Sequence, residues 1–484
     1  MGSHERMSQF SILQADQQGR LADSLAYGRL NALLDPDSYV SIDALVQSDV
    51  TGSGFARAPV VGDGVLTGYG TIDGRLVYLA AQDPAVYGGS IGVRHAAKIT
   101  KTIDLALAAG APFIGLYETG GVRIEEGLSA LEAVSELLAH LTAASGEIPL
   151  ISAVYGSCAG SASFLASAGD VLLMEKTKAS LTVNGPGVIA AIENNALTPQ
   201  AIGGAMVHAK SGLATFVEPD EASMAKRIRQ VLDYLPDTAD GFLMTENGED
   251  DPNRCEPGLD TMADGLDQGV DVRQMVDLIV DQGSFLELQS AYAPGLLSGL
   301  ARLDGRVTGI LACSGSRISA AMADKAVFLT DLCDRFAIPL VTLLDSEGFD
   351  LGSAAEQNGL ALAGTHLFKA SRFSRSPRLA VITGKAFGPA YLSLASKGSG
   401  ADLVLAWPTA EISALAPDTA AHILYRAEIA AAANPQASRQ EWVEHYATQI
   451  ASPYAAAAKG LVDEIIRPSA TRPRLISALT MLDA

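Results

Sequence analysis

Two glycine-rich turns in this sequence could each present backbone N–H groups to a developing negative charge. The first lies in residues 149–170, where an apolar run, residues 150–154, ends at Gly156 and is followed by small residues. This pattern indicates a buried strand, a tight turn and a helix start, where the first N–H groups have no partner within the helix. Two such donors pointing at a thioester oxygen would stabilise an enolate, as an oxyanion hole does. The same pattern is also typical of a plain strand–helix crossing in an α/β core.

The second turn, in residues 377–402, repeats the first. Gly384 and Gly388 follow Gly156 and Gly160 at a distance of 228 positions (384 − 156 and 388 − 160). Other matching residues keep the same order at offsets of 227 to 232 (325 − 98 and 402 − 170): Asp73 with Asp304, Lys98 with Lys325, Asp104 with Asp331, Pro112 with Pro339, Glu118 with Asp345 and Asp170 with Asp402. Because chance rarely preserves such an order, we expect two homologous α/β domains.

The expected domains are residues 20–235 and 269–484, and they are joined by residues 236–268. This connecting stretch is acidic, contains proline and glycine, and has no apolar period. These properties are typical of a linker.

Local patterns indicate which elements position the first turn. Residues 17–34 have the apolar spacing of a single helix, and residues 64–80 read as a β-hairpin around Asp73 and Gly74. A second helix is expected to end at Gly110, and residues 113–117 form a buried strand that leads into Glu118.

Composition narrows the class of protein. The chain has 484 residues, of which 48% are hydrophobic, and a net charge of −21. Its length suffices for two or three cores, and its acidity argues against nucleic acid as the main partner. The four cysteines include no CxxC pair, so we expect no metal site and no disulfide framework. A polar N-terminus without a signal peptide or long apolar segment leads us to expect a cytoplasmic protein with no membrane insertion.

Two oxyanion sites in one chain suit a reaction in which two anions form. Carboxyl transfer between biotin and an acyl-CoA is such a reaction, because the donor leaves a ureido anion and the acceptor becomes a thioester enolate. Neither step requires a nucleophile or a metal ion on the protein, since positioning and N–H donors suffice.

A series of short motifs spans nearly the whole chain. They are residues 62–65 (GDGV), 88–92 (GGSIG), 119–127 (TGGVRIEEG), 156–160 (GSCAG), 184–186 (NGP), 202–205 (IGGA), 345–349 (DSEGF), 384–388 (GKAFG) and 406–412 (AWPTAEI). These motifs resemble those of the carboxyltransferase (beta) subunits of biotin-dependent acyl-CoA carboxylases, of the propionyl-CoA and acetyl-CoA carboxylase type, and of related acyl-CoA decarboxylase subunits.

The resemblance implies a fold, an assembly and partners. It implies a crotonase-like fold (ClpP/crotonase superfamily) in each half, with the coenzyme A thioester held by the first half and biotin, on a separate carrier protein, by the second. It further implies a hexamer whose active sites lie between the first half of one subunit and the second half of another. The chain contains no Met-Lys-Met biotinylation motif, so a biotin carboxylase and a biotin carboxyl carrier subunit are the expected partners.

The resemblance also assigns the catalytic backbone donors. They are Ala159, Gly160 and Ser161 in the first half, and Gly388 and Ala390 in the second.

The substrate-binding residues implied by the resemblance are Gly120, Gly121, Val122 and Arg123, beside the CoA, and Leu392, where the family tunes acyl size. Arg123 could instead satisfy the carbonyl groups of its own turn, and Leu392 could be part of ordinary core packing. Asp345, Glu356 and Lys385 are polar candidates near the biotin site that could equally belong to structural ion pairs.

Some residues depart from the family pattern. Pro389 stands in the family's GGAY turn, and proline has no N–H; the loss of one such donor typically lowers the rate by about 10²–10³. The other departures are Glu347 for a proline, Leu362 for an arginine, His366 for a lysine and Phe216 for a polar residue. Either the turn is reshaped to use Gly388 and Ala390, or the protein no longer uses biotin or uses an unusual donor or acceptor.

The expected activity is carboxyl transfer between carboxybiotin and a short-chain acyl-CoA. The alternative is a lyase that decarboxylates a malonyl-type thioester, with or without biotin. A third hypothesis is a diverged, non-catalytic scaffold subunit.

Overall fold

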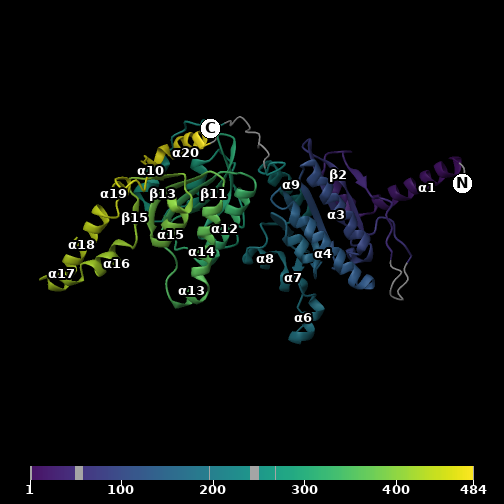
Figure 1. The fold of residues 1–484 in the computed structure, drawn as a ribbon, viewed down its shortest axis with the longest axis horizontal. Coiled ribbons are helices and arrows are strands. Elements are labelled where there is room, and N and C mark those ends of the chain that lie inside the picture. Colours follow the sequence, from purple (N-terminus) through teal and green to yellow (C-terminus); the bar gives the residue numbers. More distant parts are fainter. Residues whose placement is uncertain (1–2, 50–57, 196, 240–249, 267–268, 483–484) are drawn as a thin grey trace. The chain divides into compact units, whose positions relative to one another are not determined.

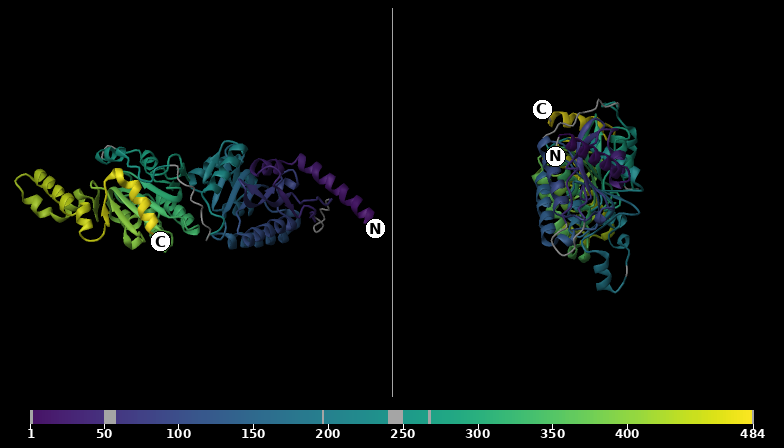
Figure 2. Two further views of the ribbon diagram at one scale, coloured as in Figure 1. Left: turned by 90° about the horizontal axis from the view of Figure 1, so that it is seen from above. Right: turned by 90° about the vertical axis from the view of Figure 1, so that its right-hand side faces the viewer.

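The computed structural model describes residues 3–49, 58–195, 197–239, 250–266 and 269–482. The chain divides into two compact units, Met1–Phe242 and Leu243–Ala484. Each unit is built on a twisted sheet flanked by helices (Figures 1 and 2). The α/β class and the tandem organisation expected from the sequence are confirmed.

The sheet of the first unit has the described strand order β1-β2-β3-β4-β5-β6-β8, and β7 pairs with the far end of β5. Strands β3 to β6 run parallel, whereas β1, β2 and β3 are antiparallel neighbours. The elements are α1 (Ser3–Ala22), α2 (Leu25–Leu33), β1 (Val40–Ile42), β2 (Val65–Ile72), β3 (Arg75–Gln82), α3 (Val93–Ala109), β4 (Phe113–Thr119), α4 (Gly127–Ala144), β5 (Leu150–Ala159), α5 (Ala162–Ser167), β6 (Val171–Glu175), β7 (Ser180–Thr182), α6 (Pro186–Glu193), α7 (Pro199–Gly203), α8 (Ala205–Ser211), β8 (Phe216–Glu218) and α9 (Glu221–Asp233).

The sheet of the second unit repeats this plan. Its described strand order is β16-β14-β13-β12-β11-β10-β9, and β15 pairs with β13 as β7 pairs with β5. The elements are α10 (Pro257–Asp264), α11 (Val272–Ile279), β9 (Leu286–Glu287), β10 (Leu297–Leu303), β11 (Arg306–Cys313), α12 (Ala320–Arg335), β12 (Leu340–Ser346), α13 (Ser353–Gln357), α14 (Leu360–Phe373), β13 (Arg378–Phe387), α15 (Gly388–Leu394), β14 (Leu403–Ala406), β15 (Glu411–Ser413), α16 (Pro417–Leu424), α17 (Arg426–Ala431), α18 (Pro435–Gln449), α19 (Pro453–Ala457), β16 (Glu464–Ile465) and α20 (Thr471–Leu482).

The repeat extends to individual hydrogen bonds. The carboxylate of Asp170 accepts the amide N–H at the start of β5, and that of Asp402 accepts the amide N–H at the start of β13, both at 2.8 Å. Asp35 accepts the two amides of the β2–β3 turn, and Asp281 accepts those of the β10–β11 turn. The same acidic side chains therefore fix the same strand ends and hairpins in both units.

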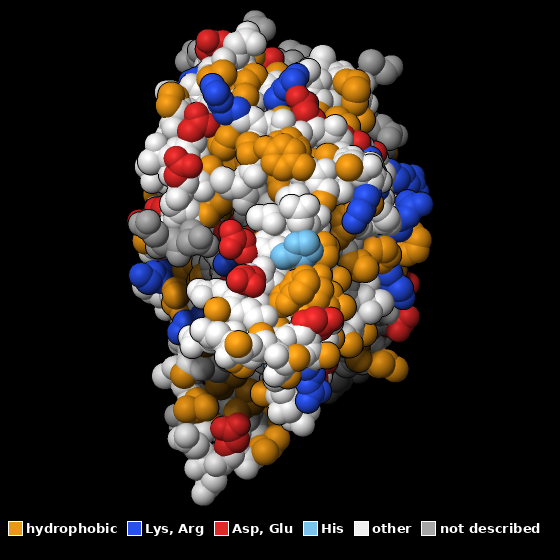
Figure 3. All heavy atoms as spheres, turned by 90° about the vertical axis from the view of Figure 1, so that its left-hand side faces the viewer, with side chains coloured by type: hydrophobic (Ala, Val, Ile, Leu, Met, Phe, Trp, Pro, Cys, Tyr) orange, Lys and Arg blue, Asp and Glu red, His pale blue; other side chains and the backbone are white. Residues whose placement is uncertain are grey.

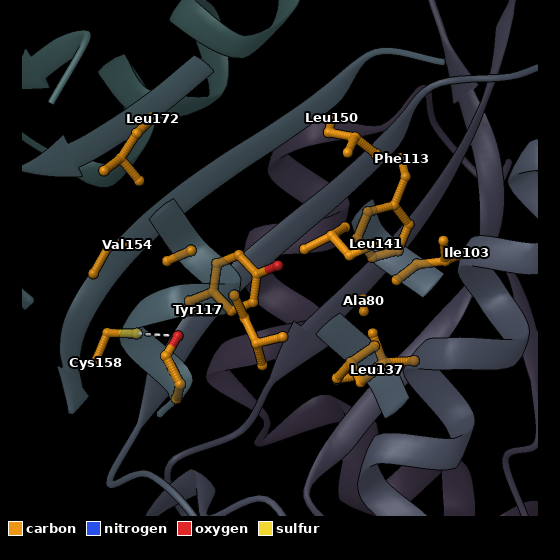
Figure 4. Packing of buried hydrophobic residues seen from close by; sticks show 14 of the residues in the cluster. Ala80, Ile103, Phe113, Tyr117, Leu137, Leu141, Leu150, Val154, Cys158 and Leu172 are labelled. Carbon is orange, nitrogen blue, oxygen red and sulfur yellow. Dashed lines mark hydrogen bonds between the residues drawn. The ribbon is translucent and has the colours of Figure 1, made fainter. Parts of the chain in front are cut away.

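The core of the first unit holds the strand that leads to the first turn. Leu150, Val154 and Cys158 of β5 are buried in one core cluster with Phe113 of β4 and Leu141 of α4 (Figure 4). At the end of β5 the buried thiol of Cys158 donates to the Ala162 carbonyl at 3.4 Å. The turn after β5 is thus anchored to a packed core, which fixes its position.

Two local predictions are confirmed and one is wrong. The hairpin is β2 and β3, with Asp73 and Gly74 both at positive φ, and α3 ends at Gly110 with a φ of 61°. Residues 17–34 form parts of two helices instead of one, because the Ser24 side chain accepts the Tyr27 amide and starts α2.

The expected linker, residues 236–268, is partly helical. Residues 240–249 and 267–268 lie outside the described residues, but α10 falls within this stretch. Pro257 starts the helix with its preset φ, and Leu259 is fully buried in the core of the second unit. Within the described ranges, no helix has the length and apolar character needed to cross a membrane.

Candidate active site

The first turn reverses the chain between β5 and α5. Gly160 has a φ of 67°, a left-handed conformation that favours glycine. Its amide N–H donates to the Thr182 carbonyl on β7 at 2.9 Å, and Ala159 pairs with Thr182 in the same ladder. The prediction that Gly160 supplies a free donor is therefore corrected: this amide belongs to the β5–β7 pairing, which the sequence did not reveal.

The next two residues, Ser161 and Ala162, have backbone N–H groups that do not take part in the β5–β7 pairing. Ser161 is the N-cap of α5 and Ala162 its first residue, so their N–H groups have no partner inside the helix. The Ser161 hydroxyl is buried and has no hydrogen-bond partner. The sequence predicted Ser161 as a backbone donor but not Ala162. The offset of 228 that relates the two turns pairs Ala162 with Ala390, which was predicted as a donor (390 − 162).

Two glycine loops lie against this turn. Gly121 has a φ of 100°, and a Cβ on it would lie 2.8 Å from the Ala159 carbonyl oxygen. Ile91 accepts from and donates to the same loop, through the Arg123 amide and the Gly121 carbonyl. The structure thus places Gly121 against the first turn; that Gly120, Gly121 and Val122 lie beside the CoA stays a prediction.

Arg123 is a structural arginine, but the carbonyl to which its side chain donates belongs to another loop and not to its own turn. Its side chain is 1% exposed and ion-paired with Asp63 at 2.7 Å and with Glu126 at 2.8 Å. It also donates to the Ser90 carbonyl at 2.8 Å and lies over the Tyr87 ring. Its guanidinium therefore ties two loops together and faces the protein interior.

Burial sets the charge state of the imidazole behind these loops. His95 is fully buried, and desolvation, with help from the Arg123 charge, lowers its pKa to about 3. The ring is therefore neutral at neutral pH, and one ring nitrogen lies 2.9 Å from the Asp63 carbonyl oxygen.

The second turn joins β13 to α15. Gly388 has a φ of 50°, and a Cβ on it would lie 3.0 Å from the Ala414 carbonyl oxygen. Pro389 follows at the position of Ser161 and Ala390 at the position of Ala162 (389 − 161 and 390 − 162). The second turn therefore keeps only one of the two leftover amides, that of Ala390.

A cavity of about 580 Å³ opens at the second turn. Gly388, Pro389 and Leu392 line it together with Arg317 and Glu347. Leu392 is 51% exposed, so it is a wall of this cavity and not part of the core.

A second cavity of about 850 Å³ shares Gly388, Pro389, Leu392 and Ala414 with the first. The face of the molecule on the α16–α18 side, seen in Figure 3, carries many apolar side chains between charged ones. Exposed apolar residues include Ile423 and Leu424 of α16, Leu415 just before α16 and Ile450 just after α18.

Of the three polar candidates of the second unit, Asp345 is held by hydrogen bonds within the fold, whereas Lys385 forms an ion pair and Glu356 lines the cavity. Asp345 is structural: its carboxylate accepts from the Ser314 hydroxyl and from the Gly315 and Lys385 amides, each at 2.8 Å. The Lys385 ammonium pairs with Glu347 at 3.2 Å, and Glu356 lines the cavity.

The other departures from the family pattern lie elsewhere. Leu362 and His366 are exposed on α14 and are not among the residues that line the 580 Å³ cavity. Phe216 is a buried residue of β8 with the Arg227 guanidinium over its ring. Among the described residues, no three His, Cys, Asp or Glu side chains gather as a metal ion would require.

Comparison with known proteins adds family information to this geometry. The family described as carboxyl transferase domain matches residues 16–484. The chain is 37% identical over 475 residues to the methylmalonyl-CoA carboxyltransferase 12S subunit of Propionibacterium freudenreichii subsp. shermanii, with 97% of this chain and 90% of the relative covered. It is 35% identical over 478 residues to the methylmalonyl-CoA decarboxylase subunit alpha of Propionigenium modestum, with 98% and 92% covered.

A solved structure is similar over the whole chain. This is the transcarboxylase 12S hexamer with methylmalonyl-coenzyme A and methylmalonic acid bound, at a TM-score of 0.94 and 34% identity, with 100% of this chain and 96% of that chain covered.

Proposed function

The chain belongs to the carboxyl transferase domain family and is an enzyme of acyl-CoA carboxyl transfer. We propose that it moves a carboxyl group between carboxybiotin, on a separate carrier protein, and a short-chain acyl-CoA. The observation that carries this proposal is the duplicated turn, one at the end of β5 and one at the end of β13.

In the first unit, the thioester oxygen of the acyl-CoA faces the amides of Ser161 and Ala162. Negative charge gathers on this oxygen when the carboxyl group joins or leaves the α-carbon, and preorganised N–H donors stabilise it. Each such donor is worth about 10²–10³ in rate. The glycine loop at Gly120 and Gly121 lets the ligand approach the backbone closely.

In the second unit, the 580 Å³ cavity receives the carboxyl donor. Its volume lies in the range of small-molecule sites, roughly 300–1,000 Å³, and its walls are mainly apolar with a few polar groups. These residues fit the bicyclic ring of biotin. Beside Pro389, the Ala390 amide is the N–H group that remains to donate a hydrogen bond. When bound, the carrier's biotin supplies the carboxyl group; this chain contributes a binding cavity and one N–H.

The assembly on this proposal is a hexamer, as in transcarboxylase 12S. Exposed apolar side chains of the first unit support an interface between subunits: Ile124 is 85% exposed, Leu128 77% and Ile192 79%. Helix α6 has no buried residue in the chain by itself. Burial of such side chains against another subunit would be favourable.

The test is turnover of malonyl-CoA and methylmalonyl-CoA by the purified chain, with and without free biotin. The proposal predicts decarboxylation that requires biotin. If tight CoA binding is seen without any turnover, the proposal is wrong and the scaffold hypothesis remains.

One observation favours a second candidate, a decarboxylating lyase. Pro389 removes a donor from the second turn, and relatives named methylmalonyl-CoA decarboxylase subunit alpha are 35–37% identical to this chain. The same assay separates the two, because decarboxylation without biotin would assign the chain to the lyase class.

A further inference from the structure

Two cavities of the second unit meet at the second turn. The 580 Å³ cavity and the 850 Å³ cavity share Gly388, Pro389, Leu392 and Ala414 as lining residues. On the proposed function, the ring of biotin lies in the 580 Å³ cavity, beside the Ala390 amide. A chain attached to this ring can therefore pass Leu392 and continue into the 850 Å³ cavity.

The 850 Å³ cavity extends along helix α15. Gly388, the first residue of this helix, lines the cavity, and so does Lys397, which comes three residues after the helix ends at Leu394 (397 − 394). A helix of seven residues is roughly 10 Å long, at about 1.5 Å per residue. The cavity is therefore long enough for a short alkyl chain.

The walls of the 850 Å³ cavity suit such a chain. Apolar side chains reach it from four places: Leu392 on α15, Ile412 on β15, Ile450 after α18 and Leu461 before β16. Burial of methylene groups against these side chains removes apolar area from water, which favours binding. The cavity volume lies within the range of small-molecule sites, roughly 300–1,000 Å³.

The charged side chains that line the 850 Å³ cavity are two lysines, Lys397 and Lys459. The Lys397 ammonium is already held by the Asp463 carboxylate at 2.6 Å, whereas Lys459 is exposed. An ammonium group offers three N–H donors and no acceptor. Lys459 can therefore donate to an oxygen atom of a ligand in this cavity.

The first unit has a serine where the second has Lys459. Ser211 precedes Gly212 as Lys459 precedes Gly460; both glycines have positive φ, of 84° and 69°, and a leucine follows each. Each segment leads into the parallel strand at the edge of its sheet, β8 or β16. The lysine thus belongs to the unit that, on the proposed function, holds the carboxyl donor.

We propose that the 850 Å³ cavity is the subsite for the arm of the carboxyl donor, and that Lys459 hydrogen-bonds the carbonyl oxygen at the end of this arm. The inference rests on the proposed function, in which the donor is biotin. The arm of biotin is an alkyl chain that joins the ring to a carbonyl group. This carbonyl belongs to an amide on a carrier protein and to a carboxylate in free biotin. Both accept a hydrogen bond from an ammonium group, and the carboxylate does so more strongly.

The test is the binding of biotin to the full-length protein, measured by NMR titration of the ligand signals. Ile450→Trp places a larger side chain in the 850 Å³ cavity at a residue that does not line the 580 Å³ cavity. We expect this variant to bind biotin about tenfold more weakly than the wild type, because the alkyl arm loses its place among apolar side chains while the ring keeps its contacts.

The matched control for this variant is Ile423→Trp. It makes the same substitution on α16, at a residue that is 59% exposed and lines neither cavity. Its affinity for biotin should equal that of the wild type.

A second pair of variants tests Lys459 at low and constant ionic strength, because salt screens exposed charges. Lys459→Met keeps an unbranched side chain and removes the ammonium. It should weaken the binding of free biotin about threefold, and that of biotin methyl ester by less, because the ester carbonyl carries no charge. Lys369→Met removes the same charge from an exposed position on α14 that lines neither cavity, and should change neither affinity.

Equal biotin affinities for Ile450→Trp and Ile423→Trp would overturn the arm subsite, as would the absence of biotin binding to the wild type. Equal losses in Lys459→Met and Lys369→Met would overturn the role of Lys459. A cooperative unfolding transition in the same buffer confirms that each variant is folded.

Binding and turnover separate this inference from the proposed function. Biotin-dependent turnover with equal affinities in the two tryptophan variants would disprove the subsite alone. Binding that depends on the arm, without biotin-dependent turnover, would disprove the proposed reaction and leave the subsite in place.

Discussion

The two units share a sheet, a turn and a glycine loop, but they differ in what surrounds each turn. In the first unit the turn offers the amides of Ser161 and Ala162, and a buried arginine, Arg123, ties the neighbouring loops from inside. In the second unit Pro389 removes one amide, and Arg317 ties the same loops from the cavity side. The fold was kept while the electrostatics of the two sites diverged.

The carboxylates beneath the two turns show the same contrast. Glu118 pairs with Arg29 at 2.7 Å, and a Cβ on Gly156 would lie 2.4 Å from Glu118. Its counterpart Asp345 lies equally close to Gly384 but accepts hydrogen bonds from uncharged groups. In both units a side chain at this glycine would therefore have to displace a carboxylate.

The largest expected effect comes from making the first turn like the second. Ser161 has a φ of −62°, which proline adopts, and Gly388 before Pro389 shows that the turn tolerates proline. Ser161→Pro should therefore fold and lower turnover of methylmalonyl-CoA by about 10²–10³, because one oxyanion donor is lost.

Ser161→Ala is the control for this change. It keeps the amide and removes only a hydroxyl that has no hydrogen-bond partner, so turnover should stay close to wild type. Equal losses in the two variants would show that the amide is not the donor.

The second prediction compares two glycines at the same place in the loops. Both Gly121→Ala and Gly348→Ala introduce a side chain at positive φ, which costs about 1–2 kcal/mol. At Gly121 the new Cβ would also lie 2.8 Å from the Ala159 carbonyl oxygen, whereas at Gly348 its nearest neighbour is 3.5 Å away. Urea denaturation should show that Gly121→Ala loses roughly 1–3 kcal/mol more than Gly348→Ala. Equal losses would mean that the two loops are not packed differently.

The third prediction concerns acid stability. The pKa of His95 is about 3 in the folded protein and ordinarily 6.5, so the unfolded chain binds the proton more readily. His95 therefore contributes stability above pH 6.5 that is lost as the pH falls toward 3. Its counterpart in the second unit is Met322 (322 − 95 = 227), which does not titrate.

His95→Met should weaken the dependence of stability on pH between 6.5 and 3, measured as the unfolding midpoint in urea at each pH. Met322→Leu serves as the control and should leave that dependence unchanged. An identical acid profile for His95→Met and the wild type would contradict the assignment.

The sequence predicted features that local patterns encode. The hairpin around Asp73 and Gly74, the helix end at Gly110 and the matched order of residues in the two halves follow from turn chemistry and spacing. Helix α10 was not predicted, because its eight residues include two aspartates and show no clear apolar period. Pro257 did mark its start.

Features that depend on distant pairing were not predictable. The Gly160 amide is taken by Thr182, which lies 22 residues later in the chain (182 − 160) on a three-residue strand. The bridge from Arg317 through Glu347 to Lys385 joins three segments, and only the folded loops bring these side chains together.

The difference between the two turns is tested most directly by the reverse exchange at the second turn. Pro389→Ser gives that turn the residue and the N–H that the first turn has at Ser161, while the first turn is left unchanged. If one missing donor distinguishes the two sites, the biotin-dependent rate of methylmalonyl-CoA decarboxylation should rise by up to about 10²-fold, without a change in any biotin-independent rate. A biotin-dependent rate no higher than that of the wild type would contradict this account.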